Sequence, residues 1–227
     1  MPGLTRDDVD VVVFDVNETL FSLGAVRSAM EGHGLPGHLV ETWFARSLRD
    51  GFALTALGEY ASFPEIGANA LASVARTAGQ PLSSDAVSEV MAAMRELDAH
   101  PDVEPAMRML REGGLRLVTL TNGTSSGTAA LLERNGLSDL VEATLSVDDV
   151  LRWKPAPEPY LHAAARAGVP PQRVVLVAVH AWDCHGARRA GLRTGWVSRL
   201  EGERAPYFDP ADLEAPTLDA WAAALVG

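Results

Sequence analysis

The most constraining feature of the chain is the segment VDVVVFDVNETLFSLGAV at residues 9–26. Four consecutive apolar residues at 11–14 predict a short strand buried on both faces, which is typical of parallel sheets covered by helices. The strand runs directly into a carboxylate, Asp15, and an amide follows two positions later at Asn17. A charged group beside a buried strand is costly unless it is paired or functional. The sequence therefore predicts an α/β sheet with a polar site at the end of this strand.

After Pro101 the sequence alternates between strand-like and helix-like segments. This alternation predicts a Rossmann-like, doubly wound parallel sheet with helices on both faces. Sheets of this class bind ligands at the carboxyl ends of their strands. The expected helices are residues 103–114, 125–137, 157–168 and 183–191, and the expected strands are residues 115–123, 141–150, 173–180 and 193–199.

The segment between the first strand and Pro101 has a different pattern. Residues 25–98 are rich in Ala, Leu and Met at helical spacing and contain no convincing strand. The stretch SDAVSEVMAAMREL at residues 84–97 shows this best, with Ser84 as the expected N-cap. At 227 residues, the chain is long enough for one α/β domain that carries a helical insertion.

Composition limits the partners of the protein. Hydrophobic residues make up 47% of the chain, which indicates a soluble globular protein. A formal charge of −11 argues against nucleic acid or an anionic membrane as a partner, although a small anionic substrate can bind at a locally positive site. The single cysteine, Cys184, cannot form an internal disulfide, and neither a secretory signal nor a membrane-length apolar run is found. We therefore expect a cytoplasmic protein with no nucleic-acid and no membrane partner.

Polar side chains stand at the ends of the expected strands. Taken alone, Thr121, Asn122 or Asp183 is better explained as the cap of a following helix. Lys154 taken alone is most simply a solvated surface lysine. Because parallel strands end at the same edge of a sheet, the set taken together predicts a functional site instead. The set consists of Asp15, Thr121, Asn122, Lys154, His180 and Asp183.

Four motifs of this chain resemble those of the haloacid dehalogenase superfamily, in the order that the superfamily uses. They are FDVNETL, LTNGT, KPAPEPY and AWDCHGARRAG. The details are most similar to the type II 2-haloacid dehalogenase branch: Asn122 directly follows Thr121, and the fourth motif begins with AWD. Tyr160, six positions after Lys154, is a further feature of that branch. The resemblance covers the whole chain.

The resemblance implies a division of the chain and a mechanism. Residues 1–20 and 99–227 would form the catalytic core, and residues 21–98 would form a helical cap inserted after the first strand. Asp15 would be a nucleophile whose ester with the substrate is cleaved by water. Asp183 would position or deprotonate that water. The family often pairs its subunits, which implies a possible homodimer.

Other residues receive roles through the same resemblance. The positive charge of Lys154 would keep the pKa of Asp15 low, so that its carboxylate stays ionised. Thr19 and Thr121 would orient the oxygens of Asp15 and of a substrate carboxylate. His180 stands where the branch usually has asparagine. It either holds or deprotonates the attacking water, or is a strand-end histidine bonded to a backbone carbonyl.

The segment TWFARSLRDGFALTALGEYASF departs from the pattern of the branch. There, a cap arginine beside a tryptophan receives the halide, and in this chain Phe44 occupies its position. Arg46 or Arg49 on the same expected helix is a candidate to bind the anion instead. The candidate substrate contacts are Asn17, Phe44, Arg46, Tyr160 and Trp182.

The amide of Asn17 indicates which kind of leaving group the site suits. Phosphatases of the superfamily carry a second Asp at this position, which protonates the departing alkoxide. Asn17 has no such proton to give, and a halide leaves without one. The phosphatases also place an extra acid four or five residues before the final Asp to help hold Mg²⁺, where this chain has Val179 and Ala178. We therefore expect catalysis without a metal or other cofactor.

Three functions stay open from the sequence. The first is hydrolytic dehalogenation of small 2-haloacids through an Asp15 ester, with inversion at carbon. The second is a Mg²⁺-dependent phosphatase acting on a small phosphate ester, which dependence of turnover on Mg²⁺ would select. The third is a binding protein that kept the fold and lost turnover, which ligand binding without turnover would select.

Overall fold

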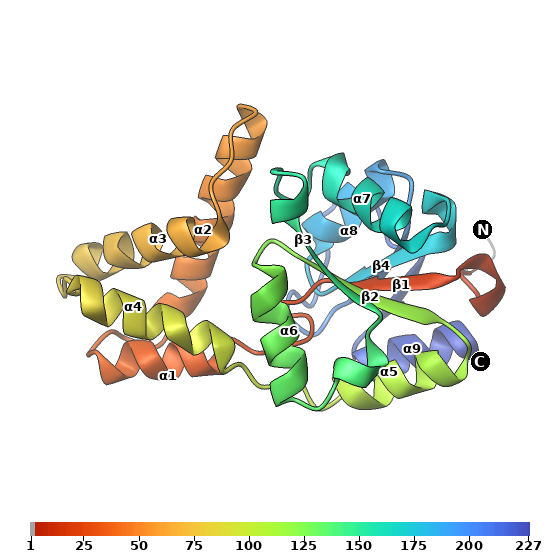
Figure 1. Cartoon of the computed structure of the whole chain (residues 1–227), viewed down its shortest axis with the longest axis horizontal. Helices are drawn as coiled ribbons and strands as arrows, with labels where there is room; N and C mark the ends of the chain where they lie inside the picture. Colours follow the sequence, from red (N-terminus) through yellow and green to blue (C-terminus); the bar gives the residue numbers. More distant parts are fainter. Residues whose placement is uncertain (1–2) are drawn as a thin grey trace.

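The computed structural model describes residues 3–227 and contains a six-stranded parallel sheet (Figure 1). The strand order is β3-β2-β1-β4-β5-β6, so that β1 lies between β2 and β4. This order confirms the predicted Rossmann-like, doubly wound α/β class. The strands are β1 (Val11–Phe14), β2 (Arg116–Thr121), β3 (Ala143–Ser146), β4 (Val174–Ala178), β5 (Arg193–Val197) and β6 (Leu213–Ala215).

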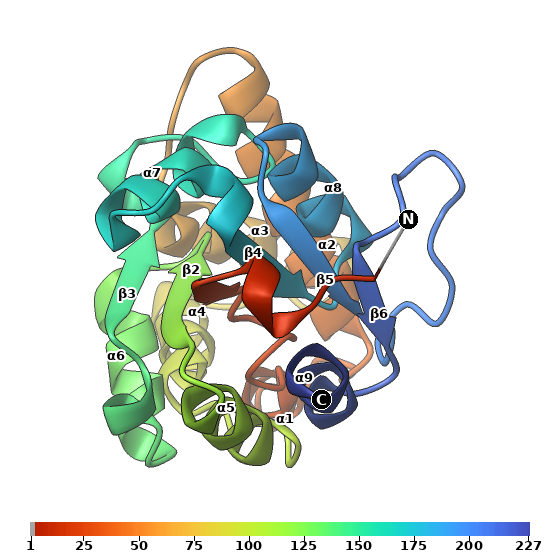
Figure 2. The same cartoon turned by 90° about the vertical axis from the view of Figure 1, so that its right-hand side faces the viewer.

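Helices cover both faces of the sheet. Helices α5, α6 and α9 lie on one face, and α7 and α8 lie on the other (Figure 2). Their bounds are α5 (Val103–Glu112), α6 (Ser125–Arg134), α7 (Pro157–Ala167), α8 (Ala181–Arg189) and α9 (Leu218–Val226). Within residues 3–227, none of the helices has the length and apolarity needed to cross a membrane.

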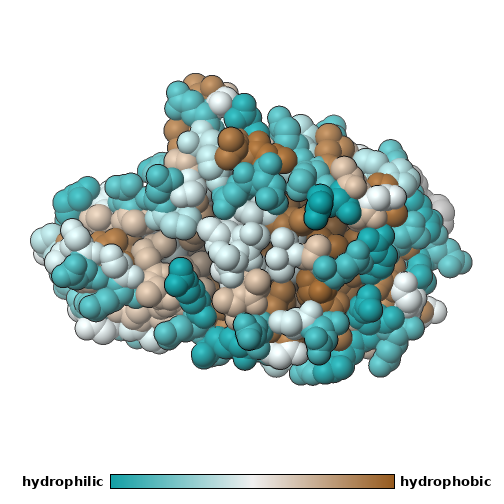
Figure 3. Space-filling model, in the orientation of Figure 1, coloured by the Kyte–Doolittle hydropathy of each residue, from teal (hydrophilic) through white to brown (hydrophobic). Residues whose placement is uncertain are grey.

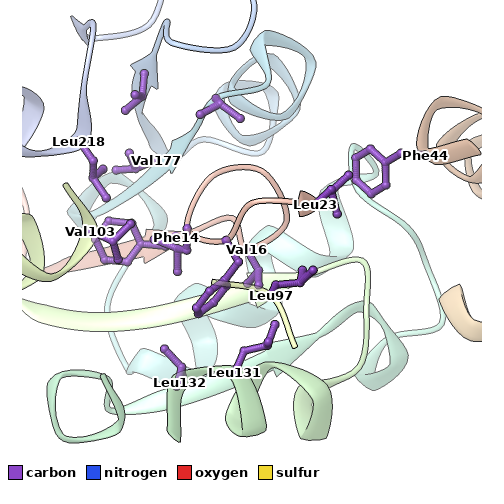
Figure 4. Close-up of a cluster of buried hydrophobic side chains, with 14 of the residues drawn as sticks. Phe14, Val16, Leu23, Phe44, Leu97, Val103, Leu131, Leu132, Val177 and Leu218 are labelled. Carbon is purple, nitrogen blue, oxygen red and sulfur yellow. The ribbon is translucent and has the colours of Figure 1, made fainter. Parts of the chain in front are cut away.

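The burial of β1 explains why the strand is apolar throughout. Successive side chains of a strand point to opposite faces of its sheet. Val12 and Phe14 pack in the cluster that includes residues of α5 and α9, whereas Val11 and Val13 pack with residues of α7 and α8. Figure 4 shows Phe14 together with Val103 of α5 in the first cluster. The strand is therefore held between two helical layers.

The helices between β1 and α5 lie together beside one end of the sheet (Figure 1). The cap of α4 is Ser83, whose side chain accepts a hydrogen bond from the N–H of Ala86. The predicted cap, Ser84, is instead the first residue of the helix. Two adjacent serines satisfy the same pattern, and the extended backbone at Ser83 decides between them. The bounds are α1 (Gly24–Gly32), α2 (Leu39–Ala56), α3 (Phe63–Thr77) and α4 (Ser84–Ala92).

Some predicted bounds were wrong. Strand β4 ends at Ala178 rather than at His180, because the chain turns there and His180 becomes the N-cap residue of α8. Strand β6 and helix α9 were not predicted. β6 has only three residues and is partly exposed, and α9, with the sequence LDAWAAALV, is apolar at too many positions to show a helical period.

The register of the sheet aligns its strand ends. Phe14 of β1 pairs with Thr119 of β2 and with Val177 of β4. The residues that follow these three therefore stand side by side at the carboxyl edge. The N–H of Asp15 donates to the Val177 carbonyl at 3.0 Å, which continues the pairing to the carboxylate itself.

Trp153 connects the helical segment to the rest of the protein. Its indole and backbone N–H groups donate hydrogen bonds to residues within 55–61, each at 3.0 Å. Its ring stacks on Phe63 with centroids 6.0 Å apart. Gly51 of α2 lies so close to the ring that a Cβ atom there would be 2.4 Å from it. Because Lys154 is the next residue, this contact also restrains Lys154.

Gly51→Ala should destabilise the protein by about 1–3 kcal/mol, because a methyl group does not fit beside the Trp153 ring. Gly32→Ala is the matched control, since Gly32 is also helical and an added Cβ there would meet no atom within 4 Å. Alanine is the better helix former, so the control should keep or gain stability. Urea denaturation followed by circular dichroism measures both variants. Equal free energies of unfolding would contradict the packing of α2 on Trp153.

Candidate active site

Lys154 is the only lysine of the chain, and its side chain is fully buried at the carboxyl edge of the sheet. A buried ammonium group needs an acceptor for each of its three N–H donors. Nζ donates to two carboxylates, Asp15 Oδ1 at 2.8 Å and Asp183 Oδ2 at 2.6 Å. The third donor bonds to the Leu120 carbonyl at 3.0 Å. Burial lowers the pKa of Lys154, but the two carboxylates raise it above its usual value.

Asp15 is ionised in this environment. Thr19 Oγ1 donates to Asp15 Oδ2 at 2.6 Å, whereas Thr121, which was also expected to orient this carboxylate, accepts a backbone hydrogen bond instead. Burial raises the pKa of Asp15, but the positive charges of Lys154 and His180 outweigh it and hold the pKa below its usual range. An ionised carboxylate beside a pocket can act as a nucleophile toward carbon or phosphorus.

Asp183 lies on the other side of Lys154 and is fully buried. Its Oδ1 accepts a hydrogen bond from the Tyr160 hydroxyl at 2.6 Å. Tyr160 was expected to contact the substrate, but its fully buried ring lies behind Asp183 and orients that carboxylate. Burial raises the pKa of Asp183, and the Asp15 charge adds to this effect while Lys154 opposes it. Asp183 is therefore the stronger base of the two carboxylates.

Thr121 and Asn122 shape the loop after β2 rather than the helix that follows. Thr121 Oγ1 accepts from the N–H of Gly123 at 2.8 Å, and Asn122 Oδ1 accepts from the N–H of Lys154 at 3.0 Å. The N-cap of α6 is Thr124, so neither predicted residue is a cap. Asn122 thus ties the loop after β2 to the segment that carries the buried ammonium.

A small pocket opens onto Asp15 beneath aromatic residues of α2 and α3. It shares Asn17 and Phe63 with a larger cavity of about 500 Å³ between α4 and α6. A cavity of about 500 Å³ holds a small molecule, whereas the pocket at Asp15 encloses only about 10 Å³, so the larger cavity provides the room beside Asp15. In Figure 3 the region between these helices is mostly white to pale brown, which marks intermediate hydropathy, and is crossed by teal, hydrophilic atoms. The lining of the small pocket consists of Asp15, Asn17, Phe44, Leu48, Phe63, Asn122, His180 and Trp182.

The face of α2 that meets this pocket is apolar. Phe44 and Leu48, four residues apart, lie on the same side of the helix and line the pocket. Arg46 is two positions from Phe44, which turns it about 200° around the helix axis and away from the pocket. Arg49 is exposed and paired with Asp50 at 2.8 Å. The structure therefore places both candidate arginines outside the pocket, with the Phe44 ring in it.

Trp182 closes the pocket from the side of α8. Its ring centroid is 5.4 Å from that of His180 and 5.0 Å from that of Phe52 on α2. Of the predicted substrate contacts, Trp182, Phe44 and Asn17 thus lie on the pocket wall. Residues far apart in the chain form one aromatic enclosure.

His180 lies between two carboxylates. Nε2 is 3.0 Å from Glu18 Oε2, and Nδ1 is 3.3 Å from Asp15 Oδ2. Burial lowers the pKa of His180, but these carboxylates outweigh burial and raise the pKa to about 10. The ring is therefore protonated at neutral pH and cannot act as a base. The ring bonds to the Glu18 carboxylate rather than to a backbone carbonyl. Two predicted roles of His180 were therefore wrong: the base that deprotonates water, and the strand-end histidine bonded to a carbonyl.

Glu18 was not among the predicted site residues. Its backbone is left-handed, with φ of 64°, a region that favours glycine. Such a conformation costs on the order of 1–3 kcal/mol and is concentrated at functional sites. The sequence signal is weak, because the partner His180 lies 162 positions away.

The residues around Asp15 do not fit a Mg²⁺ site, which requires several oxygen ligands. The positions at which related phosphatases carry an extra acid are Val179 and Ala178, and both are apolar and buried. The Lys154 ammonium already bridges Asp15 and Asp183. Within residues 3–227, no group of three or more His, Cys, Asp and Glu side chains is placed to hold a metal ion.

A family model described as haloacid dehalogenase-like hydrolase matches residues 9–191. (S)-2-haloacid dehalogenase 4A of Burkholderia cepacia is 30% identical over 214 residues, which cover 93% of each chain. (S)-2-haloacid dehalogenase 1 of Pseudomonas sp. (strain CBS-3) is 28% identical over 206 residues, covering 90% of this chain and 91% of that protein. The solved structure of an L-2-haloacid dehalogenase from Xanthobacter autotrophicus, with chloropropionic acid covalently bound, matches with a TM-score of 0.87. That likeness has 25% identity and covers 95% of this chain and 97% of the other.

The chain therefore belongs to the haloacid dehalogenase-like hydrolases, in the type II 2-haloacid dehalogenase branch of the superfamily. The predicted family is thereby confirmed. The predicted class of enzyme, a hydrolase that acts on carbon–halide bonds, is confirmed as well.

Lys154→Met should lower the free energy of unfolding by about 3–5 kcal/mol at pH 7, because it leaves two buried carboxylates without their cation. In the wild type, the low pKa of Asp15 contributes stability above the unfolded value of 3.8, and this is lost as the pH falls through the folded pKa. In the variant the carboxylates resist ionisation, so the deficit should grow as the pH rises above about 4.

Urea unfolding at pH 4.5 and pH 7 measures this dependence. Arg134→Met is the control, since Arg134 forms an exposed pair with Asp98 at 3.5 Å and should change stability by at most about 1 kcal/mol. A deficit for Lys154→Met that is the same at both pH values would argue against a buried ionic cluster.

Proposed function

We propose that this protein hydrolyses small 2-haloacids through an ester on Asp15, without a metal or other cofactor. The observation that supports this most is the buried Lys154 ammonium, which holds Asp15 ionised beside a small pocket. The similarity to (S)-2-haloacid dehalogenases supports the choice of substrate class.

In the first proposed step, Asp15 attacks the carbon that carries the halogen. The bond between carbon and halogen breaks, and the halide leaves with the electron pair on the side opposite the attack. The carbon is inverted and an ester joins it to Asp15. Lys154 and Thr19 each donate a hydrogen bond to this carboxylate and so fix its orientation for the attack.

In the second proposed step, water attacks the carbonyl carbon of the ester. Asp183, held by the Tyr160 hydroxyl, is the base that accepts a proton from this water. Lys154 donates to Asp15 Oδ1, where it stabilises negative charge that develops during the attack. Cleavage of the ester releases a 2-hydroxy acid and restores the Asp15 carboxylate.

The substrate would bind between the two parts of the chain. We assign residues 1–20 and 99–227 to the catalytic core and residues 21–98 to a cap over the pocket. Phe44 of the cap would contact the alkyl part of the acid. Asn122 accepts through Oδ1 from Lys154, which leaves its NH₂ group to donate to the anionic substrate.

Chloride release from 2-chloropropionate should be unaffected by EDTA and should fall by a factor on the order of 1,000 or more in Asp15→Asn, because an amide is a poor nucleophile. Asp10→Asn is the matched control: Asp10 also adjoins β1 but pairs with Arg173 at the surface, so chloride release should stay at the wild-type rate. Phosphate release from p-nitrophenyl phosphate is measured in parallel. Phosphate release that requires Mg²⁺, with no chloride release, would select a phosphatase.

A further inference from the structure

His180 presents an N–H group to the pocket that no other described residue uses. Its Nδ1 atom is buried and has no hydrogen-bond partner among residues 3–227. It lies 3.3 Å from Asp15 Oδ2, in an ion pair that is not aligned as a hydrogen bond. The ring lines the same pocket as Asp15. A group bound in this pocket can therefore accept a hydrogen bond, or a proton, from Nδ1.

Glu18 determines which nitrogen of the ring gives up a proton. A carboxylate only accepts hydrogen bonds, so Nε2 donates to Glu18 and keeps its proton. Glu18 and Asp15 are the charged groups paired with the ring, and the uncharged rings of Phe44 and Trp182 also lie beside it. The ring is thus a cation whose available proton is on Nδ1, toward the pocket.

Displacement of a halide has no need of this proton. A halide leaves as a stable anion, whereas an alkoxide is a poor leaving group unless an acid protonates it. Within the small pocket the cap contributes Phe44 rather than a cation, whereas Arg95 lines the adjoining larger cavity. Asn17 has no proton to transfer. The unpartnered N–H of His180 is therefore the group on this pocket that can protonate a leaving oxygen.

We propose that His180 is a general acid and that the site opens strained cyclic ethers next to a carboxylate, the class of 2,3-epoxy acids. This rests on the proposed function, because it uses the same Asp15 ester. Asp15 attacks a ring carbon and the carbon–oxygen bond of the ring breaks. The electron pair goes to the ring oxygen, which takes the proton from His180 Nδ1. The product is an Asp15 ester with a neighbouring hydroxyl group.

Hydrolysis of this ester restores the enzyme. Water adds to the carbonyl carbon of Asp15 with Asp183 as base, and the ester bond breaks. One proton of the water ends on the product hydroxyl, and the other returns to His180. The net reaction adds one water to the epoxide and yields a 2,3-dihydroxy acid.

The test compares an oxygen and a chloride leaving group on the same protein. Oxirane-2-carboxylate is assayed by chromatography of glycerate, and 2-chloropropionate by chloride release. The wild type should turn over both, and Asp15→Asn neither. His180→Asn should lower turnover of the epoxide at least about tenfold more than that of the chloride, because only the epoxide needs the proton. His185→Asn is the control, since His185 pairs with Asp209 away from the pocket, and it should change neither rate.

Glu18→Gln adds a readout that a purely structural role would not move. It removes one of the two carboxylates that raise the pKa of His180 to about 10, so the acid form is lost at a lower pH. The rate of ring opening should then decline on the alkaline side at a lower pH than in the wild type. The rate with 2-chloropropionate should show no such displacement.

The outcomes separate the two proposals. If chloride release depends on Asp15 but the wild type does not open the epoxide, His180 is not the proposed acid and the ester mechanism stands. The same conclusion follows if His180→Asn slows both substrates equally. If Asp15→Asn keeps both activities, or the wild type turns over neither substrate, the proposed function fails together with this inference.

Discussion

The site depends on one interaction, the burial of a single ammonium group between two carboxylates. Lys154 is stable in this position because each of its three N–H donors has an acceptor within 3.0 Å. These acceptors come from the end of β1, from β2 and from α8. They converge because β1 lies between β2 and β4, so the strand order brings the acceptors together around the ammonium group.

The cluster also gives different pKa values to two side chains of the same type, those of Asp15 and Asp183. Asp15 has a lowered pKa because Lys154 and His180 add positive charge to its surroundings, whereas burial raises the pKa of Asp183. A nucleophile must stay ionised, and a residue that activates water must be the stronger base. His180 adds a cation that faces the pocket, and its charge depends on Glu18.

The sequence was sufficient where structure follows from local pattern. The apolar residues 11–14 predicted a buried strand, and Asp15 at its end predicted where the polar groups would meet. The sequence was insufficient where the role of a residue depends on the direction of its side chain or on a partner far away in the chain. Tyr160 turns behind the site because its ring belongs to the packing between α7 and the sheet. The contact of Glu18 with His180 joins residues 162 positions apart, and no local pattern indicates it.

The ester on Asp15 is tested most directly by a single turnover in heavy-oxygen water, with the protein in excess over 2-chloropropionate. Proteolysis and mass spectrometry then locate the label. Because the proposed water attacks the carbonyl carbon of the ester, the heavy oxygen should appear in the peptide that contains Asp15 and be absent from the 2-hydroxy acid. Label in the product alone would mean that water attacks the substrate carbon directly, and it would contradict the covalent mechanism.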